Sequence, residues 1–167
     1  MDLLDRLLGH DAWTTRELLL RSRDLTDDEL DHDFDIGHRT LRRTFLHIIR
    51  NMEVWTDLIA AVPVREDAGC DESGRSIERL LERLDVVVPQ LQKVARRIVD
   101  EGRLDDLWLD HLDDPPTEKS YGGAIVHLAT HGMHHRAQAL FLLRKLGVTD
   151  LPEGDALSWE MQFLASS

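Results

Sequence analysis

Apolar residues recur every three or four positions through four long stretches of the chain, and this spacing limits the fold more than any other feature. It is the period of an amphipathic α-helix, which buries one face against other helices. The stretches cover residues 2–22, 38–62, 76–101 and 120–146. Pro89 lies inside the third and is predicted to kink or divide it, and Gly147 is placed to end the fourth.

The connections between these predicted helices are long. They cover residues 23–37, 63–75 and 102–119, so consecutive helices need not be antiparallel neighbours. One short further helix is expected over residues 156–164, and no stretch has the alternation of a β-strand or a Gly-rich phosphate loop. The 167 residues are therefore predicted to form one all-α domain, a four-helix bundle covering residues 1–167.

Charge and apolar content argue against two classes of partner. The net charge of −12 opposes binding to the phosphates of nucleic acid. No apolar run approaches the roughly 20 residues needed to cross a bilayer. The amino-terminal stretch lacks the basic and apolar regions of a signal peptide. We therefore expect a cytoplasmic protein that binds neither nucleic acid nor membrane.

Cysteine is represented by a single residue, Cys70. One cysteine excludes an intramolecular disulfide and a zinc site built from cysteines. The residue lies in the polar segment DAGCDESG, and we interpret it as incidental, with a reactive thiol as the alternative.

Four of the nine histidines fall between residues 127 and 135, inside the fourth predicted helix. On a helical wheel with His131 at zero, the apolar stripe lies between about 20° and 80°. His131 and His135 lie on this stripe or at its margin, whereas His127 and His134 lie at its edge. His127 and His135 are about 12 Å apart along the axis, so only pairs three or four residues apart can readily share an ion. These pairs are 127/131, 131/134 and 131/135, and burial favours the last.

Histidines on an apolar face are often core residues whose hydrogen bonds are satisfied. Two of them one turn apart are harder to explain in this way, because burying both imidazoles costs free energy unless each nitrogen finds a partner. A divalent metal ion would be a partner for both His131 and His135.

A third ligand has to come from another helix, and the best candidate is His47 in LRRTFLHIIRNMEVW. By the same wheel it lies roughly 110° from the centre of its apolar stripe, on the flank. Thr44 and Asn51, one turn to either side, lie on this flank and could line a polar pocket. The remaining histidines are expected to be exposed, in loops or near helix ends: His10, His32, His38 and His111.

Three histidines around one ion leave a coordination position for water or substrate. The ion would lower the pKa of a water or thiol bound there. Imidazole ligands suit zinc, nickel, iron or copper. Gln138, on the same side of the helix, and the rim histidines His127 and His134 are predicted to line the pocket or to hydrogen bond to the ligands.

Three segments resemble the DinB-like (damage-inducible) family. They are LHIIRNMEVW around His47, HGMHHRAQAL around His131 and His135, and the closing LRKLGV. The resemblance covers nearly the whole chain and implies a four-helix bundle in up-down-down-up order with long crossover connections. It also implies a divalent metal, with zinc, nickel or iron the best candidates, held by these three histidines. Members are frequently homodimers.

Relatives with assigned chemistry include metal-dependent transferases and maleylpyruvate isomerases that use low-molecular-weight thiols. The resemblance therefore implies an enzyme that activates a small thiol, or water, against an electrophilic small molecule. A metal-dependent hydrolase is the alternative, but it needs a general base, and only Glu53 and Asp57 follow on the same helix. A non-catalytic stress-response module is the third possibility, with a structural metal and a fourth ligand such as His127 or His134.

An apolar stripe on the fourth helix predicts a further contact surface. Val126, Met133 and Leu140 recur every seven residues, about 140° to 160° from the core stripe. Either a homodimer or packing of the C-terminal segment, with Trp159 and Phe163, would cover it.

Overall fold

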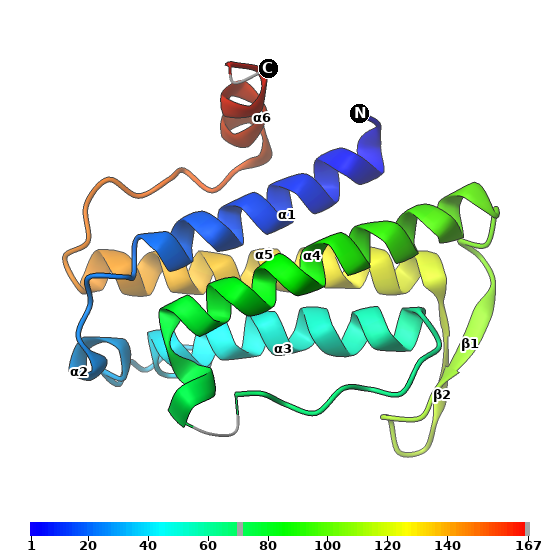
Figure 1. Cartoon of the computed structure of the whole chain (residues 1–167), viewed down its shortest axis with the longest axis horizontal. Helices are drawn as coiled ribbons and strands as arrows, with labels where there is room; N and C mark the ends of the chain where they lie inside the picture. The colour runs from blue at the N-terminus through cyan, green and yellow to red at the C-terminus, as the bar shows by residue number, and fades with distance from the viewer. Residues whose placement is uncertain (70–71, 166–167) are drawn as a thin grey trace.

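The computed structural model describes residues 1–69 and 72–165, a range that leaves out Cys70, and it consists mainly of helices (Figure 1). The long helices are α1 (Leu3–Leu20), α3 (Leu41–Ile59), α4 (Ile77–Asp100) and α5 (Tyr121–Lys145). The shorter elements are α2 (Asp27–Leu30), the 3₁₀-helix η1 (Glu72–Arg75) and α6 (Ala156–Ala165). The predicted all-α fold is confirmed.

Capping side chains explain where the long helices begin. Asp2, Thr40, Ser76 and Ser120 each precede a long helix, and each accepts a hydrogen bond from a backbone N–H of the first turn. The fourth predicted helix ends where expected, because Gly147 adopts a φ of 82° just beyond it.

Pro89 does not divide the third predicted helix, because α4 continues through it from Ile77 to Asp100. Proline removes one backbone donor, which leaves the carbonyl of Asp85 without its helical partner. Both residues are exposed, so water can hydrate this carbonyl.

The expectation of no strand is wrong for the segment between α4 and α5. Strands β1 (Leu107–Asp110) and β2 (Thr117–Ser120) pair antiparallel, with Leu107 opposite Ser120. Each has only four residues, most of them exposed or half-buried, so no alternation of buried and exposed positions marks them. A buried Asp110 holds the pair together by accepting a 2.5 Å hydrogen bond from Lys119 Nζ.

The four long helices surround one core. Helices α1 and α3 each pack against both α4 and α5. Fully buried side chains from every long helix meet in this core, among them Leu19, Phe45, Leu80 and Leu142. None of the described helices combines the length and the apolar character that a bilayer crossing requires.

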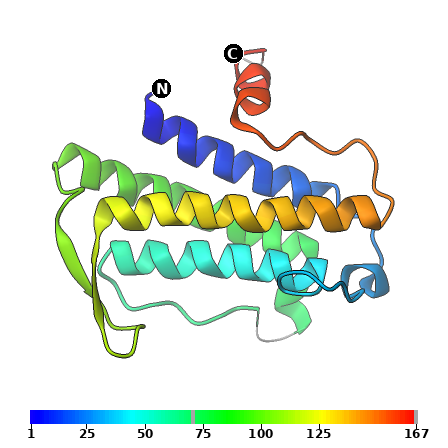
Figure 2. The same ribbon diagram turned by 180° about the vertical axis from the view of Figure 1, so that it is seen from behind.

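Helices α3 and α4 run in the same direction, and α1 and α5 run in the opposite one (Figures 1 and 2). The segment that joins α3 to α4 therefore travels back along the bundle before α4 begins. This arrangement leaves α3 and α5 side by side, which positions the candidate site.

Helix α6 lies outside the bundle, against α1. Trp159 is buried there and lies so close to Gly9 that a Cβ at this glycine would be 2.8 Å from the indole. The stripe predicted on the fourth helix is covered only in part. Leu140 is 9% exposed and contacts the segment before α6, whereas Val126 and Met133 are 56% and 55% exposed.

Candidate metal centre

The three histidines predicted as metal ligands lie together between α3 and α5. His47 extends from α3, and His131 and His135 extend from successive turns of α5. The ring centroid of His135 is 4.5 Å from that of His47 and 4.4 Å from that of His131. The Nε2 atoms of His47 and His131 are 2.8 Å apart. Side-by-side packing of two helices thus brings together donors that are far apart in the sequence.

His38 joins this cluster, contrary to the expectation that it is exposed. It is half-buried, and its ring centroid lies 4.0 Å from that of His47 and 5.0 Å from that of His135. The loop before α3 turns inward through two residues with positive φ, Gly37 at 51° and Arg39 at 70°. His38, His47 and His135 each offer a ring nitrogen within 4.8 Å of the other two, a separation at which one ion could bind all three.

Of the other histidines expected to be exposed, His10 is buried and His32 and His111 are exposed. His10 Nε2 lies 3.0 Å from the carbonyl oxygen of Gly154, and the ring packs edge-on against Trp159. The position of α6 over α1, which no local pattern indicates, accounts for its burial.

Gln138 orients the ring of His135. Its side-chain oxygen accepts a hydrogen bond from His135 Nδ1 at 2.9 Å, so the lone pair of this ring is on Nε2. Its side-chain nitrogen lies 3.0 Å from His134 Nε2 and donates to it. The predicted pocket residues Gln138 and His134 therefore form one chain of hydrogen bonds behind His135, the usual arrangement behind a metal-binding imidazole.

The remaining predicted pocket residues have different surroundings. His127 is exposed and its ring lies between those of His131 and Trp55, with centroid distances of 5.1 and 4.9 Å. Asn51 is half-buried. Thr44 is fully buried, and its hydroxyl donates to the carbonyl of Thr40 within the helix.

The surroundings of the cluster favour neutral imidazoles. Burial lowers the pKa of His38 and of His135 below the ordinary value. Burial, together with repulsion between neighbouring imidazoles, lowers the pKa of His47 and of His131 to about 4. At neutral pH each ring therefore keeps an unprotonated nitrogen, which is the form that binds metal. Neutral nitrogen donors fit a divalent transition metal.

Residues 1–160 match the sequence model of the DinB family. The chain belongs to the DinB family. This match confirms the resemblance carried by the segments around His47, His131 and His135. No curated protein matches the sequence closely enough to count as a relative.

Helix α5 of this DinB-family protein is joined to α1 by a buried ion pair that the histidine pattern does not reveal. Arg136 donates a hydrogen bond to Asp11 of α1, and each side chain is 4% exposed. A Cβ on Gly132 would be 2.6 Å from Arg136 Nη1 and 2.7 Å from Asp11 Oδ1, so only glycine leaves room for this contact. The pair joins α5 to α1, and we expect it to help direct His131 and His135 toward α3.

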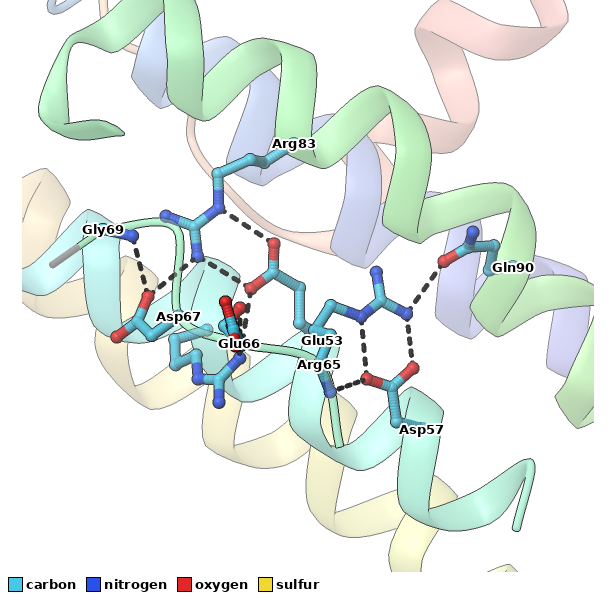
Figure 3. A network of polar contacts seen from close by, with 9 residues as sticks. Glu53, Asp57, Arg65, Glu66, Asp67, Gly69, Arg83 and Gln90 are labelled. Atoms are coloured by element: carbon cyan, nitrogen blue, oxygen red, sulfur yellow. Dashed lines mark hydrogen bonds and ion pairs between the residues drawn. The ribbon is translucent and has the colours of Figure 1, made fainter. Parts of the chain in front are cut away.

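The two carboxylates that a hydrolase could use as a base are both paired with arginines (Figure 3). Glu53 forms a bidentate pair with Arg83 of α4, at 2.9 and 2.7 Å, and both side chains are buried. Asp57 accepts hydrogen bonds from the side chain and the backbone N–H of Arg65. Neither carboxylate is available to the cluster.

Proposed function

We propose that this DinB-family protein binds a divalent metal ion through His47, His131 and His135 and activates a small thiol for transfer to an electrophilic small molecule. The observation that carries the proposal is the 2.8 Å distance between the Nε2 atoms of His47 and His131, beside the ring of His135. Two nitrogens bound to one zinc ion at about 2.1 Å each are at most about 4.2 Å apart, a condition that this pair meets.

Two sets of three histidines could bind the ion, and both contain His47 and His135. They differ in whether the third ligand is His131 or His38. We assign it to His131 rather than to His38, because His131 lies one turn before His135 on the same helix and directly touches His47. His38 extends from a loop, between Gly37 and Arg39, and lies beside the cluster.

A bound metal would lower the pKa of a thiol or water at its free coordination position. His38 would accept the proton that is released, because its ring lies beside those of His47 and His135. Gln138 would keep the Nε2 atom of His135 directed at the ion through its hydrogen bond to Nδ1. We keep the expectation that the protein works in the cytoplasm, where small thiols are reduced.

Hydrolysis is the second candidate chemistry, and the position of His38 favours it. A hydrolase needs a base beside the attacking water, and His38 supplies one where Glu53 and Asp57 cannot. Turnover of a thiol with an electrophile would support the transferase, and cleavage of an ester or amide without thiol would support the hydrolase.

A non-catalytic metal module is the third candidate. Four clustered imidazoles, those of His38, His47, His131 and His135, could fill a tetrahedral shell and leave no open position. Removal of such a structural metal would unfold the protein, because the binding energy is part of the folding energy. An open catalytic site should instead survive chelation with its helix content unchanged by circular dichroism.

Metal analysis of alanine variants tests the ligand assignment. The changes His47→Ala, His131→Ala and His135→Ala should each abolish stoichiometric metal, whereas His38→Ala should retain metal and lose turnover. His32→Ala is the matched control, since His32 is exposed. Full metal content in any of the first three variants would remove that residue from the shell. Metal loss in His38→Ala would favour the four-histidine module.

The reaction is tested with metal-loaded protein and a panel of low-molecular-weight thiols, each paired with an alkylating or epoxide electrophile. We expect thiol consumption that stops on chelation and returns when metal is added. An absence of turnover with every physiological thiol would refute the transferase. Such a result would not affect the proposed metal binding by His47, His131 and His135, which the alanine variants test separately.

A further inference from the structure

A second pocket lies on the α4 side of α3 and has no part in the histidine cluster. It has a volume of about 550 Å³ and is bounded by the last turns of α3, the segment that follows and the outer side of α4. Its apolar lining comes from Ala60, Val62 and Val94. The volume lies within the range of sites for small organic ligands.

One wall of this pocket is a guanidinium group held in a fixed position. Arg65 Nε and Nη2 donate to Asp57 at 2.7 and 2.5 Å, and Nη2 also donates to Gln90 on α4 at 3.0 Å. Figure 3 shows that the remaining nitrogen of the guanidinium group, Nη1, points away from Asp57. It has no partner among the residues that the structure describes, so an ordered donor is left at the pocket.

Two further positively charged side chains line the pocket, one helical turn apart on α4. Lys93 and Arg97 both line it, both are exposed, and neither is paired with a carboxylate in the described part of the chain. The charge of Asp57 is already neutralised by Arg65. The pocket is therefore locally positive in a chain whose net charge is −12.

The inner lining contains an unsatisfied polar group. Thr56 lines the pocket at 2% exposure, and within the described residues its hydroxyl has no hydrogen-bond partner. A buried hydroxyl without a partner costs free energy, and a ligand with a polar group beside Thr56 would offset this cost.

We propose that this pocket binds a small organic anion with a carboxylate or phosphate head and a compact apolar body. The head would lie among Arg65, Lys93 and Arg97, and the body would lie on Ala60, Val62 and Val94. Such a ligand matches both the unpaired positive charge and the apolar lining, whereas an inorganic anion or a neutral hydrocarbon matches only one of them. The site is independent of the metal centre and of its proposed reaction.

Titration of ¹⁵N-labelled protein tests this proposal, with phenyl phosphate and benzoate as the anions and benzyl alcohol as the neutral analogue. Saturable shifts are expected at the amides of Val62, Arg65 and Val94 with at least one anion, and its preferred head group identifies the class. Benzyl alcohol and inorganic phosphate should each bind about tenfold more weakly than the better anion.

Charge-removing variants complete the test. Lys93→Gln combined with Arg97→Gln should raise the dissociation constant about tenfold without changing the fold, since both residues are exposed. The matched control is Arg144→Gln with Lys145→Gln, which removes the same charge from exposed positions on α5. Any of three results would overturn the proposal: no saturable shift with either anion, equal binding of benzyl alcohol, or equal weakening by the control.

Discussion

Gly37 offers the sharpest test of how the loop before α3 supports the metal centre. A Cβ at this position would be 2.4 Å from Gln138 Oε1 and 2.8 Å from its side-chain carbon, so Gly37→Ala has to displace the Gln138 amide. Displacement breaks the 2.9 Å hydrogen bond to His135 Nδ1. The glycine also has a φ of 51°, where alanine is strained.

Two separate magnitudes follow from this geometry. The left-handed backbone should cost about 1–2 kcal/mol of unfolding free energy. Loss of the hydrogen bond behind His135 should weaken metal binding about 10- to 100-fold, as is usual when a metal-binding imidazole loses its partner. Urea unfolding measures the first quantity and competition with a chromophoric chelator measures the second.

Two further variants separate the two effects. Gly102→Ala is the matched control, because Gly102 has a φ of 69° and a Cβ there would meet nothing within 4 Å. It should lose similar stability and keep full metal affinity. Gln138→Ala should lower metal affinity with little loss of stability. Combining it with Gly37→Ala should lower metal affinity almost no further, because both substitutions remove the same hydrogen bond. The proposed coupling would be refuted by wild-type metal affinity in Gly37→Ala. It would also be refuted if the two substitutions lowered metal affinity additively in the double variant.

Three other predictions follow from the same contacts. Because the pKa values of His47 and His131 are lowered to about 4, the metal-free fold should be most stable above pH 6.5 and lose stability as the pH falls toward 4. Solvent screening limits this loss to about 1 kcal/mol per pH unit, and urea midpoints should become less pH-dependent in His47→Gln. Glu53→Gln removes the nearer of the two carboxylates beside the buried Arg83, leaving only Asp67 at 3.5 Å, and should cost about 3 kcal/mol by urea unfolding, whereas a cost below about 1 kcal/mol would contradict the role of the pair. A homodimer is expected to cover Val126 and Met133, so light scattering should show twice the chain mass, and a glutamate at both positions should give a monomer.

Helix positions were predictable because their signals are local. Apolar spacing and the capping residues Thr40, Ser76 and Ser120 define three of the helix starts within the sequence itself. The β-hairpin was missed for the opposite reason. Its strands are short and mostly exposed, and its stability comes from contacts such as Lys119 with Asp110 that span the turn.

In the candidate site too, local signals were predictive and contacts between distant residues were not. His131 and His135 are one turn apart on one helix, so their proximity follows from helix geometry alone. His47 required a choice of partner helix, and the family resemblance supplied the same residue. His38 could not be found in this way, because its place depends on two residues of positive φ and on Gly37 fitting closely against Gln138.

The buried pair of Arg136 with Asp11 could not be predicted from the sequence either, although Arg136 lies in the segment that carries the histidines. Gly132 and Arg136 stand among the histidines of HGMHHRAQAL, yet they face α1 rather than α3. A residue that faces away from the metal can still control it, because the rotation of α5 sets where both of its candidate ligands point. Gly132→Ala should therefore disturb the buried pair of Arg136 with Asp11 and lower metal affinity without touching any histidine. Unchanged affinity in a folded Gly132→Ala variant would show that packing against α3 alone orients the helix.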